Sequence, residues 1–329
     1  MSIAKSMNTY IKILKNAWEI TLEQKQWWAL AALAGLVYTG AVFNTLIRTF
    51  LHLQSADKLG TQQLAQISPF FSWVLSYARN MALLETPHLL LSISICILIF
   101  VLIVFIALVA QHMLLLFVSK GKKEHSWKSI CKQLRHIHIL RLFSINAIMK
   151  ILFVIVIGCT TLALAWLSTS DSSLDALIRT GVFAIALPFA FFIEVFGMIA
   201  LIGLVKKDAS IGKTMVRAMS LLRNHWLVTF ELSLILFIVN FITSAILFVI
   251  LLCVAIIAGM IFEMTLLIGS YVLLSIITFL ALLITTALVI IYAGAITTFN
   301  YAAWTQMCNY LERYSHFPAL EHMLRKILK

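Results

Sequence analysis

The chain is poor in charged residues. Only 12% of its 329 residues are Asp, Glu, Lys or Arg, whereas 62% are hydrophobic. Soluble domains carry about 25% charged residues, so this composition excludes an ordinary soluble globular protein. Apolar runs long enough to cross a bilayer recur along the chain. Because a helix satisfies its own backbone hydrogen bonds in lipid, we expect an all-α, polytopic membrane protein.

Acidic residues are scarcer still. The chain has 13 Asp and Glu against 25 Lys and Arg, which gives a net charge of +12. In a soluble protein this excess would suggest nucleic acid. Here the cations lie in short segments between apolar runs, where they select the cytoplasmic side and meet anionic lipid. We therefore expect anionic membrane lipids, and no nucleic acid, as the partner of this charge.

Motifs of catalysis and metal binding are missing as well. The chain lacks His-Glu-x-x-His, Gly-x-Ser-x-Gly and Gly-x-Gly-x-x-Gly. Gly212-Lys213-Thr214 resembles the end of a phosphate-binding loop, but Lys207 stands where the first glycine belongs. The five cysteines are scattered and indicate small apolar positions rather than disulfides or metal ligands: Cys96, Cys131, Cys159, Cys253 and Cys308. The prediction is a protein with no enzymatic activity, no metal and no cofactor.

Six apolar segments are long enough to be transmembrane helices. They cover about 27–47, 89–118, 143–167, 177–205, 226–257 and 266–301. A tight connection around Glu263 is expected between the last two. These two segments exceed the thickness of a bilayer, so we expect them to be tilted or to project from it.

Amphipathic segments precede three of these spans. The first carries apolar residues at steps of 4, 3, 4 and 4, namely Met7, Ile11, Leu14, Trp18 and Leu22. The third has the same steps in Ile211, Met215, Ala218, Leu222 and Trp226, and the second places Trp127, Ile130, Cys131, Leu134 and Ile137 on one side. These spacings predict helices with cations on the opposite face, which lie flat at a membrane surface. We call each such helix an elbow.

The elbows divide the chain into three similar units. Each unit is an elbow followed by a two-span hairpin, and the units cover roughly 1–118, 119–205 and 206–304. Residues 305–329 are expected to form a cytoplasmic amphipathic tail. All but four of the 25 Lys and Arg residues fall on the side of the elbows and the tail. By the positive-inside rule, both termini are then cytoplasmic.

The third elbow and the last span resemble a known family. Ala218 followed by Leu221-Leu222-Arg223-Asn224-His225-Trp226 is similar to a recurring alanine, apolar, basic and tryptophan pattern. That pattern occurs in six-span bacterial proteins of the YciC type and in the membrane domain fused to some glycerophosphoryl diester phosphodiesterases. Gly294 to Tyr310, with Tyr301 and Trp304, resembles the family's exit segment. The resemblance implies a six-helix fold in the bacterial inner membrane with no settled activity. The phosphodiesterase activity is not implied, because no soluble segment is long enough for that domain.

Glu194 is the most informative polar residue within a span. It lies about 18 Å of helix before Lys206, near the middle of the membrane. A carboxylate at that depth costs at least ~2.5–3.5 kcal/mol, so it should face the bundle or be protonated. Two interpretations follow: a proton-coupling or cation-binding site, or a structural carboxyl hydrogen-bonded to Asn240 or Lys150.

Two further charges lie at shallow depth in the third and fifth spans. Lys150 and Glu231 could form an ion pair between these spans, or Lys150 could extend to the interface. On the elbows, the cations expected at lipid head groups are Lys128, Lys132, Arg135, Lys213 and Arg217. Each is worth about 1 kcal/mol near an anionic surface. The alternative is that they only set the topology.

Three functions fit these features. The first is a non-enzymatic inner-membrane protein of envelope or lipid organisation, with its elbows on anionic lipid. The second is a secondary transporter or flippase that uses Glu194. The third is a membrane subunit of a larger complex whose partner supplies the activity. The protein partner is then either a second copy of this chain, in a homo-oligomer, or another membrane protein. The small number of polar residues within the spans favours the first and third.

Overall fold

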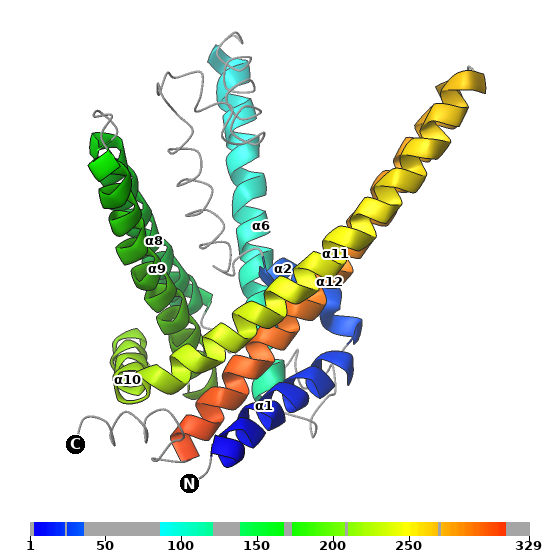
Figure 1. Ribbon diagram of the computed structural model, residues 1–329. Helices are drawn as coiled ribbons and strands as arrows, with labels where there is room; N and C mark the ends of the chain where they lie inside the picture. The colour runs from blue at the N-terminus through cyan, green and yellow to red at the C-terminus, as the bar shows by residue number, and fades with distance from the viewer. Residues whose placement is uncertain are drawn as a thin grey trace. The chain divides into compact units, whose positions relative to one another are not determined.

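The computed structural model describes residues 3–23, 25–35, 86–120, 139–167, 173–207, 210–268 and 271–313. Within these ranges every residue except Ser210 and His225 lies in a helix (Figure 1). The helices in chain order are α1 (Ile3–Glu23), the 3-10 turn η1 (Lys25–Trp27), α2 (Trp28–Gly35), α6 (Thr86–Lys120), α8 (Ile139–Leu167), α9 (Ser173–Lys207), α10 (Ile211–Asn224), α11 (Trp226–Ile268) and α12 (Tyr271–Arg313). The prediction of an all-α protein is confirmed for this part of the chain.

Among the described residues, five helices are long and apolar enough to cross a membrane. Their candidate spans are Leu91–Ser119, Leu140–Thr160, Thr180–Lys206, Trp226–Leu267 and Tyr271–Glu312. Large apolar side chains on them are exposed, as lipid contact requires, for example Leu98, Phe241 and Leu282. The chain is therefore a multi-pass helical membrane protein. The predicted first span, 27–47, lies largely outside the described residues, which end here with α2 at Gly35.

The last two spans are longer than the sequence predicted. Glu263, where a connection was expected, lies inside α11, which continues to Ile268. A single glutamate in an apolar run does not end a helix, because glutamate has a high helix propensity. At the other end, α12 runs on to Arg313, so 305–313 continues the span instead of beginning a separate tail helix. Proline, which would stop the helix, first follows at Pro318.

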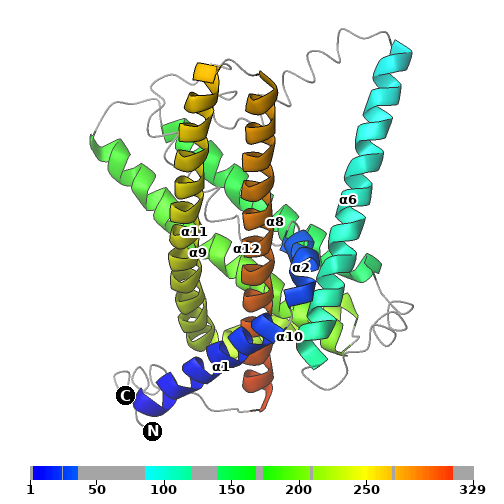
Figure 2. The ribbon, with the colours of Figure 1, turned by 90° about the vertical axis from the view of Figure 1, so that its right-hand side faces the viewer.

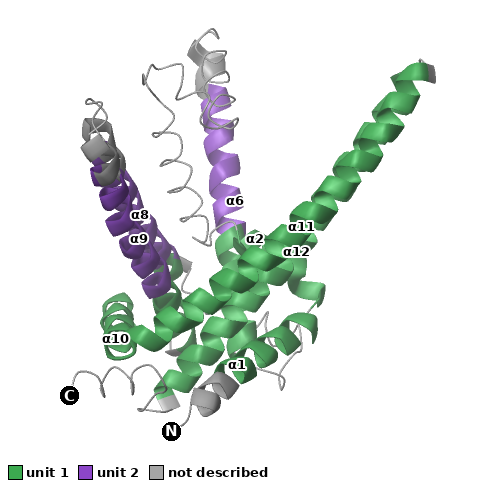
Figure 3. Ribbon diagram, viewed as in Figure 1, with its two compact units in different colours: residues 1–37, 107–142, 198–329 green, residues 38–106, 143–197 purple. Residues whose placement is uncertain are grey.

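The chain divides into two compact units, coloured separately in Figure 3. Unit 1 contains residues 1–37, 107–142 and 198–329, and unit 2 contains 38–106 and 143–197. In unit 1, α11 and α12 form an antiparallel hairpin whose helices lie side by side in Figures 1 and 2. Helices α1 and α2 both pack against α12, which makes α12 the central element of this unit.

Two glycines allow α2 to approach α12 closely. A methyl group on Gly294 would lie 2.1 Å from the carbonyl oxygen of Trp28. One on Gly35 would lie 2.9 Å from Oγ1 of Thr297. Small residues at such crossings let helix backbones come together in membranes, where packing replaces the hydrophobic effect as the driving force.

In unit 2, helices α8 and α9 pack around Ala190. The side chains against it are Phe153, Ile157 and Phe183. A methyl group on Gly197 would lie 3.0 Å from Cγ of Met149, so a glycine again marks a close contact. Helices α8 and α9 thus meet through small residues and through aromatic and aliphatic side chains.

Candidate membrane-interface site

Helix α1 is the first predicted elbow, and the face that packs against the protein is not the predicted apolar stripe. The buried residues are Tyr10, Ile13, Ala17, Ile20 and Thr21. Ile11 and Trp18, two members of the predicted apolar stripe, remain 54% and 52% exposed. Successive helical residues are about 100° apart, so the two stripes are neighbouring faces of one helix. The sequence contains two apolar faces, and α12 packs against the one that the spacing did not single out.

The remaining surface of α1 is charged. Lys12, Lys15 and Glu23 are exposed on the third side of the helix. At the border of the packed face, the ring of Trp18 meets Phe299 edge-on with centroids 6.1 Å apart. A helix with one packed, one exposed apolar and one charged face fits the boundary of protein, lipid and water.

Tyr10 fastens α1 to α11. Its hydroxyl donates a hydrogen bond to the carboxylate of Glu231. Burial, and then the neighbouring carboxylate, raise the pKa of the Tyr10 phenol above its ordinary value, because both disfavour the phenolate. From the sequence, we expect Lys150 either to pair with Glu231 or to extend to the interface. Lys150 is exposed on α8 and belongs to unit 2, so that pair stays a prediction.

Helix α10 is the third predicted elbow. Its buried residues are Thr214, Ala218 and Leu222, of which the last two belong to the predicted apolar stripe. Met215 of that stripe is half-buried, and Trp226 is exposed at the start of α11. Thr214 can be buried because its hydroxyl donates to the carbonyl oxygen of Ser210 at 3.0 Å. Gly203 of α9 leaves room for its methyl group.

The outer side of α10 combines apolar and cationic residues. Val216 is 72% exposed, and Met219 is exposed beside it. Lys213 and Arg223 are exposed on the same helix. This combination is typical of helices that lie in the head-group region.

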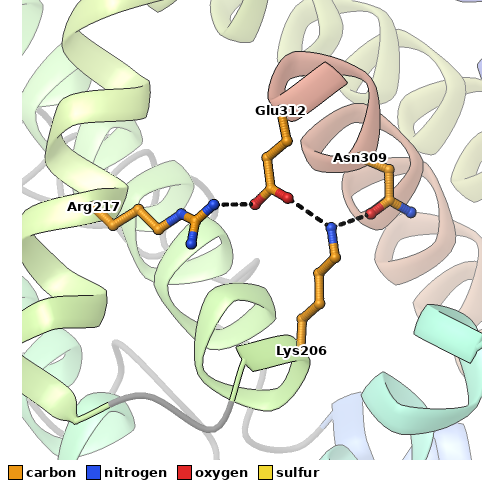
Figure 4. A network of polar contacts seen from close by, with 4 residues as sticks. All are labelled: Lys206, Arg217, Asn309 and Glu312. Atoms are coloured by element: carbon orange, nitrogen blue, oxygen red, sulfur yellow. Dashed lines mark hydrogen bonds and ion pairs between the residues drawn. The ribbon is translucent and has the colours of Figure 1, made fainter.

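A polar network joins α9, α10 and α12 (Figure 4). Lys206 Nζ donates to Asn309 Oδ1 at 2.7 Å and to Glu312 Oε2 at 2.8 Å. Arg217 Nη2 donates to Glu312 Oε1 at 3.0 Å. Arg217, predicted to meet lipid, is therefore already paired with a carboxylate, whereas Lys213 is exposed one turn before it. The predicted lipid contacts on the second elbow lie outside the described residues: Lys128, Lys132 and Arg135.

A row of small and polar residues on α12 leads to this network. It consists of Gly294, Thr298, Tyr301, Thr305, Cys308 and Glu312, at steps of 4, 3, 4, 3 and 4. Within it, Tyr301 accepts a hydrogen bond of 2.7 Å from the buried amide of Gln111. The sequence analysis above did not predict this row, because it searched for periodic apolar residues and not for periodic polar ones. The regular spacing of the row is a signal that could have identified it.

The intramembrane residues predicted as a polar site are divided between the two units. Glu194 is half-buried in α9 of unit 2, directly before a buried run from Val195 to Ile202. Asn240 is half-buried in α11 of unit 1, and its Oδ1 has no hydrogen-bond partner among the described residues. The pairing of Glu194 with Asn240 or Lys150 stays a prediction.

The fold and this site define a class: a helical, multi-pass membrane protein with amphipathic helices attached to its last hairpin. Over the described part of the chain, no group of three or more His, Cys, Asp or Glu residues could hold a metal ion. No family model, curated protein or solved structure matches the sequence. The resemblance to the YciC-type family therefore stays a prediction.

Proposed function

We propose that this protein is a non-enzymatic protein of the bacterial inner membrane that organises lipid or the cell envelope. Helices α1 and α10 hold anionic lipid at the cytoplasmic surface. Six spans cross the bilayer, the first of them in 27–47, and both termini are cytoplasmic. The distribution of Lys and Arg supports this orientation, since cations accumulate in cytoplasmic segments.

One observation supports the proposal most directly: the two described elbows, α1 and α10, each expose apolar and cationic side chains on the same helix. On α1 these are Trp18 and Lys15, and on α10 they are Val216 and Lys213. An exposed apolar face gains free energy in the acyl region, while each nearby cation gains about 1 kcal/mol from anionic head groups. Both contributions are available only at a membrane surface that contains anionic lipid.

Native mass spectrometry on protein purified in mild detergent tests the proposal. Phosphatidylglycerol and phosphatidylcholine with identical chains are offered at equal concentration, and the retained lipids are counted. We expect a preference for phosphatidylglycerol that falls about fivefold in Lys213→Gln, since 1 kcal/mol corresponds to that factor. Ser220→Gln, a neutral change at an exposed position of the same helix, is the control. Equal retention of both lipids in the unaltered protein would refute the proposal.

A second candidate function rests on Glu194. Its half-buried position in a candidate span supports a transporter or flippase that binds a cation or proton there. The same mass spectrometry on Glu194→Gln is its test. Loss of a bound ligand from a folded variant would favour transport, and an unchanged ligand pattern would assign Glu194 a structural role. If the spectrum instead shows this protein bound to a second protein and without a small ligand, the result would favour a subunit of a larger complex.

A further inference from the structure

We propose that Lys206 and Arg217 form a phosphate-binding site that Glu312 occupies from within the chain. Glu312 would act as an internal counter-ion and compete with the phosphate group for the two cations. This inference rests on the proposed function and deepens it, because competition with Glu312 would set how strongly lipid phosphate binds at α10.

The geometry around Glu312 matches the requirements of a tetrahedral oxyanion. Lys206 and Arg217 come from different helices and bind different oxygens of one carboxylate, at 2.8 and 3.0 Å (Figure 4). A phosphate group also offers neighbouring oxygens to more than one donor. Arginine and lysine are its usual protein ligands, because both remain charged and donate several hydrogen bonds.

Among the described side chains, the charge of this cluster remains positive with Glu312 in place. Lys206 and Arg217 both bind the carboxylate of Glu312, and Asn309 contributes a neutral amide oxygen to Lys206. Lys213 is exposed four residues before Arg217, and residues at this spacing are neighbours on a helix surface. An approaching phosphate group therefore meets an excess of positive charge.

The cluster also lies at the ends of two candidate spans, where lipid head groups are expected. Lys206 ends the candidate span Thr180–Lys206, and Glu312 ends the span Tyr271–Glu312. The side chains of Lys206, Arg217 and Glu312 are 29%, 40% and 20% exposed, so the site can be reached from the surface. Ion pairs at this exposure contribute little to stability, so exchanging the carboxylate for a phosphate costs little.

The test uses the full chain in nanodiscs of phosphatidylglycerol mixed with phosphatidylcholine, with nanodiscs of phosphatidylcholine alone as the blank. The selectivity is the ratio of bound phosphatidylglycerol to bound phosphatidylcholine, relative to their ratio in the nanodisc. Glu312→Gln frees both cations and is expected to raise the selectivity for phosphatidylglycerol about fivefold. Adding Lys206→Gln to that variant should abolish the gain. Glu263→Gln also removes one exposed carboxylate, but from the far part of α11, and is expected to leave the selectivity unchanged.

A second variant keeps the test decisive if Glu312→Gln does not fold. Asn309→Asp preserves the shape of the side chain and places a second carboxylate beside Lys206, so it should lower the selectivity. An unchanged selectivity in a folded Glu312→Gln or Asn309→Asp protein would overturn the inference. In a separate experiment, inorganic phosphate is added to the Glu312→Gln protein. If inorganic phosphate displaces the lipid, the site binds free phosphate. If it does not displace the lipid, the site binds the phosphate group of the lipid.

Failure of this inference can be separated from failure of the proposed function. If Lys213→Gln weakens lipid binding while Glu312→Gln leaves it unchanged, the elbows bind lipid and Glu312 is only a structural partner. If the unaltered protein shows no preference for phosphatidylglycerol and neither variant changes this, both proposals are wrong.

Discussion

At the scale of single residues, the contact between Tyr10 and Glu231 connects positions that are 221 apart in the sequence. A phenol that donates to a carboxylate forms a charge-assisted hydrogen bond, worth about 1.5–3 kcal/mol. Removing the hydroxyl also leaves the half-buried carboxylate with one donor fewer. Loss of the Tyr10 hydroxyl should therefore weaken the attachment of α1 to α11.

The raised pKa of Tyr10 predicts a loss of stability in alkali. The ordinary pKa of a tyrosine is about 10, and that value applies when α1 is detached. The stabilisation is therefore fully present below about pH 10 and is lost as the pH rises above it, because only the detached state ionises readily. Both Glu231 and Tyr310 oppose a charge on Tyr10.

Thermal unfolding between pH 8 and pH 11 measures this effect. Above about pH 10, the midpoint of the unaltered protein should fall more steeply than that of Tyr10→Phe. Tyr271→Phe, at an exposed tyrosine, should behave like the unaltered protein. Parallel curves for Tyr10→Phe and the unaltered protein would contradict the prediction.

Gly294 supports a second prediction at this scale. In Gly294→Ala the new methyl group would collide with the carbonyl of Trp28, so α2 must move away from α12. We expect a loss of about 1–3 kcal/mol, the usual cost of overpacking, seen as a lower unfolding midpoint. Gly259→Ala in α11 has open space around the new methyl group and should be neutral or stabilising. Equal midpoints for the two variants would show that the crossing is not tightly packed.

At the scale of elements, α1 shows where periodicity stops being informative. The stripe through Ile11 and Trp18 and the stripe through Ile13 and Ala17 are both compatible with an amphipathic helix. Only the packing against α12 selects between them, because that choice depends on the shape of a distant helix. The helix itself could be predicted, but its buried face could not.

The three faces of α1 predict different environments for adjacent residues. Nitroxide labels on cysteines introduced at Ile11 and Lys12, in a protein lacking its own cysteines, report collisions with dissolved oxygen and with a water-soluble nickel chelate. In liposomes, the label at position 11 should favour oxygen, which concentrates in lipid, and the label at position 12 should favour the chelate. The same ratio at both positions would place the exposed apolar face in water.

Helices α11 and α12 are each about twice as long as the hydrocarbon core of a bilayer is thick. Each has 43 residues, or about 64 Å, whereas the hydrocarbon core of a bilayer is about 30 Å thick. The sequence indicated that these spans were too long, and the structure extends both. A hairpin of this length must be strongly tilted or must extend beyond the hydrocarbon layer.

At the scale of the whole molecule, side chains on the surface of the candidate spans are expected to contact lipid and not water. Cys96, Cys159 and Cys253 are exposed within or beside candidate spans. In intact membranes, a membrane-impermeant maleimide should not modify them, because a charged reagent does not enter hydrocarbon. After denaturation in detergent all three should react. Rapid labelling in the intact membrane would show that these helix faces line water.

The same reagent tests the orientation. In a cysteine-free background, Glu263→Cys should react from outside intact spheroplasts, whereas Lys213→Cys should react only after the membrane is opened. The opposite pattern would reverse the topology and remove the cytoplasmic placement of α10.

The sequence by itself determined the class of this protein. Scarce charge, long apolar runs and helical periodicity were sufficient for a helical membrane chain, for the five candidate spans among the described residues and for the existence of α1 and α10, because these depend on local composition. Tertiary structure alone decided which face of α1 is buried, which group Glu231 pairs with, and that Glu312 joins Lys206 to Arg217. Those contacts bring together residues about a hundred or more positions apart. No local pattern encodes such pairs, since they follow from how whole helices pack.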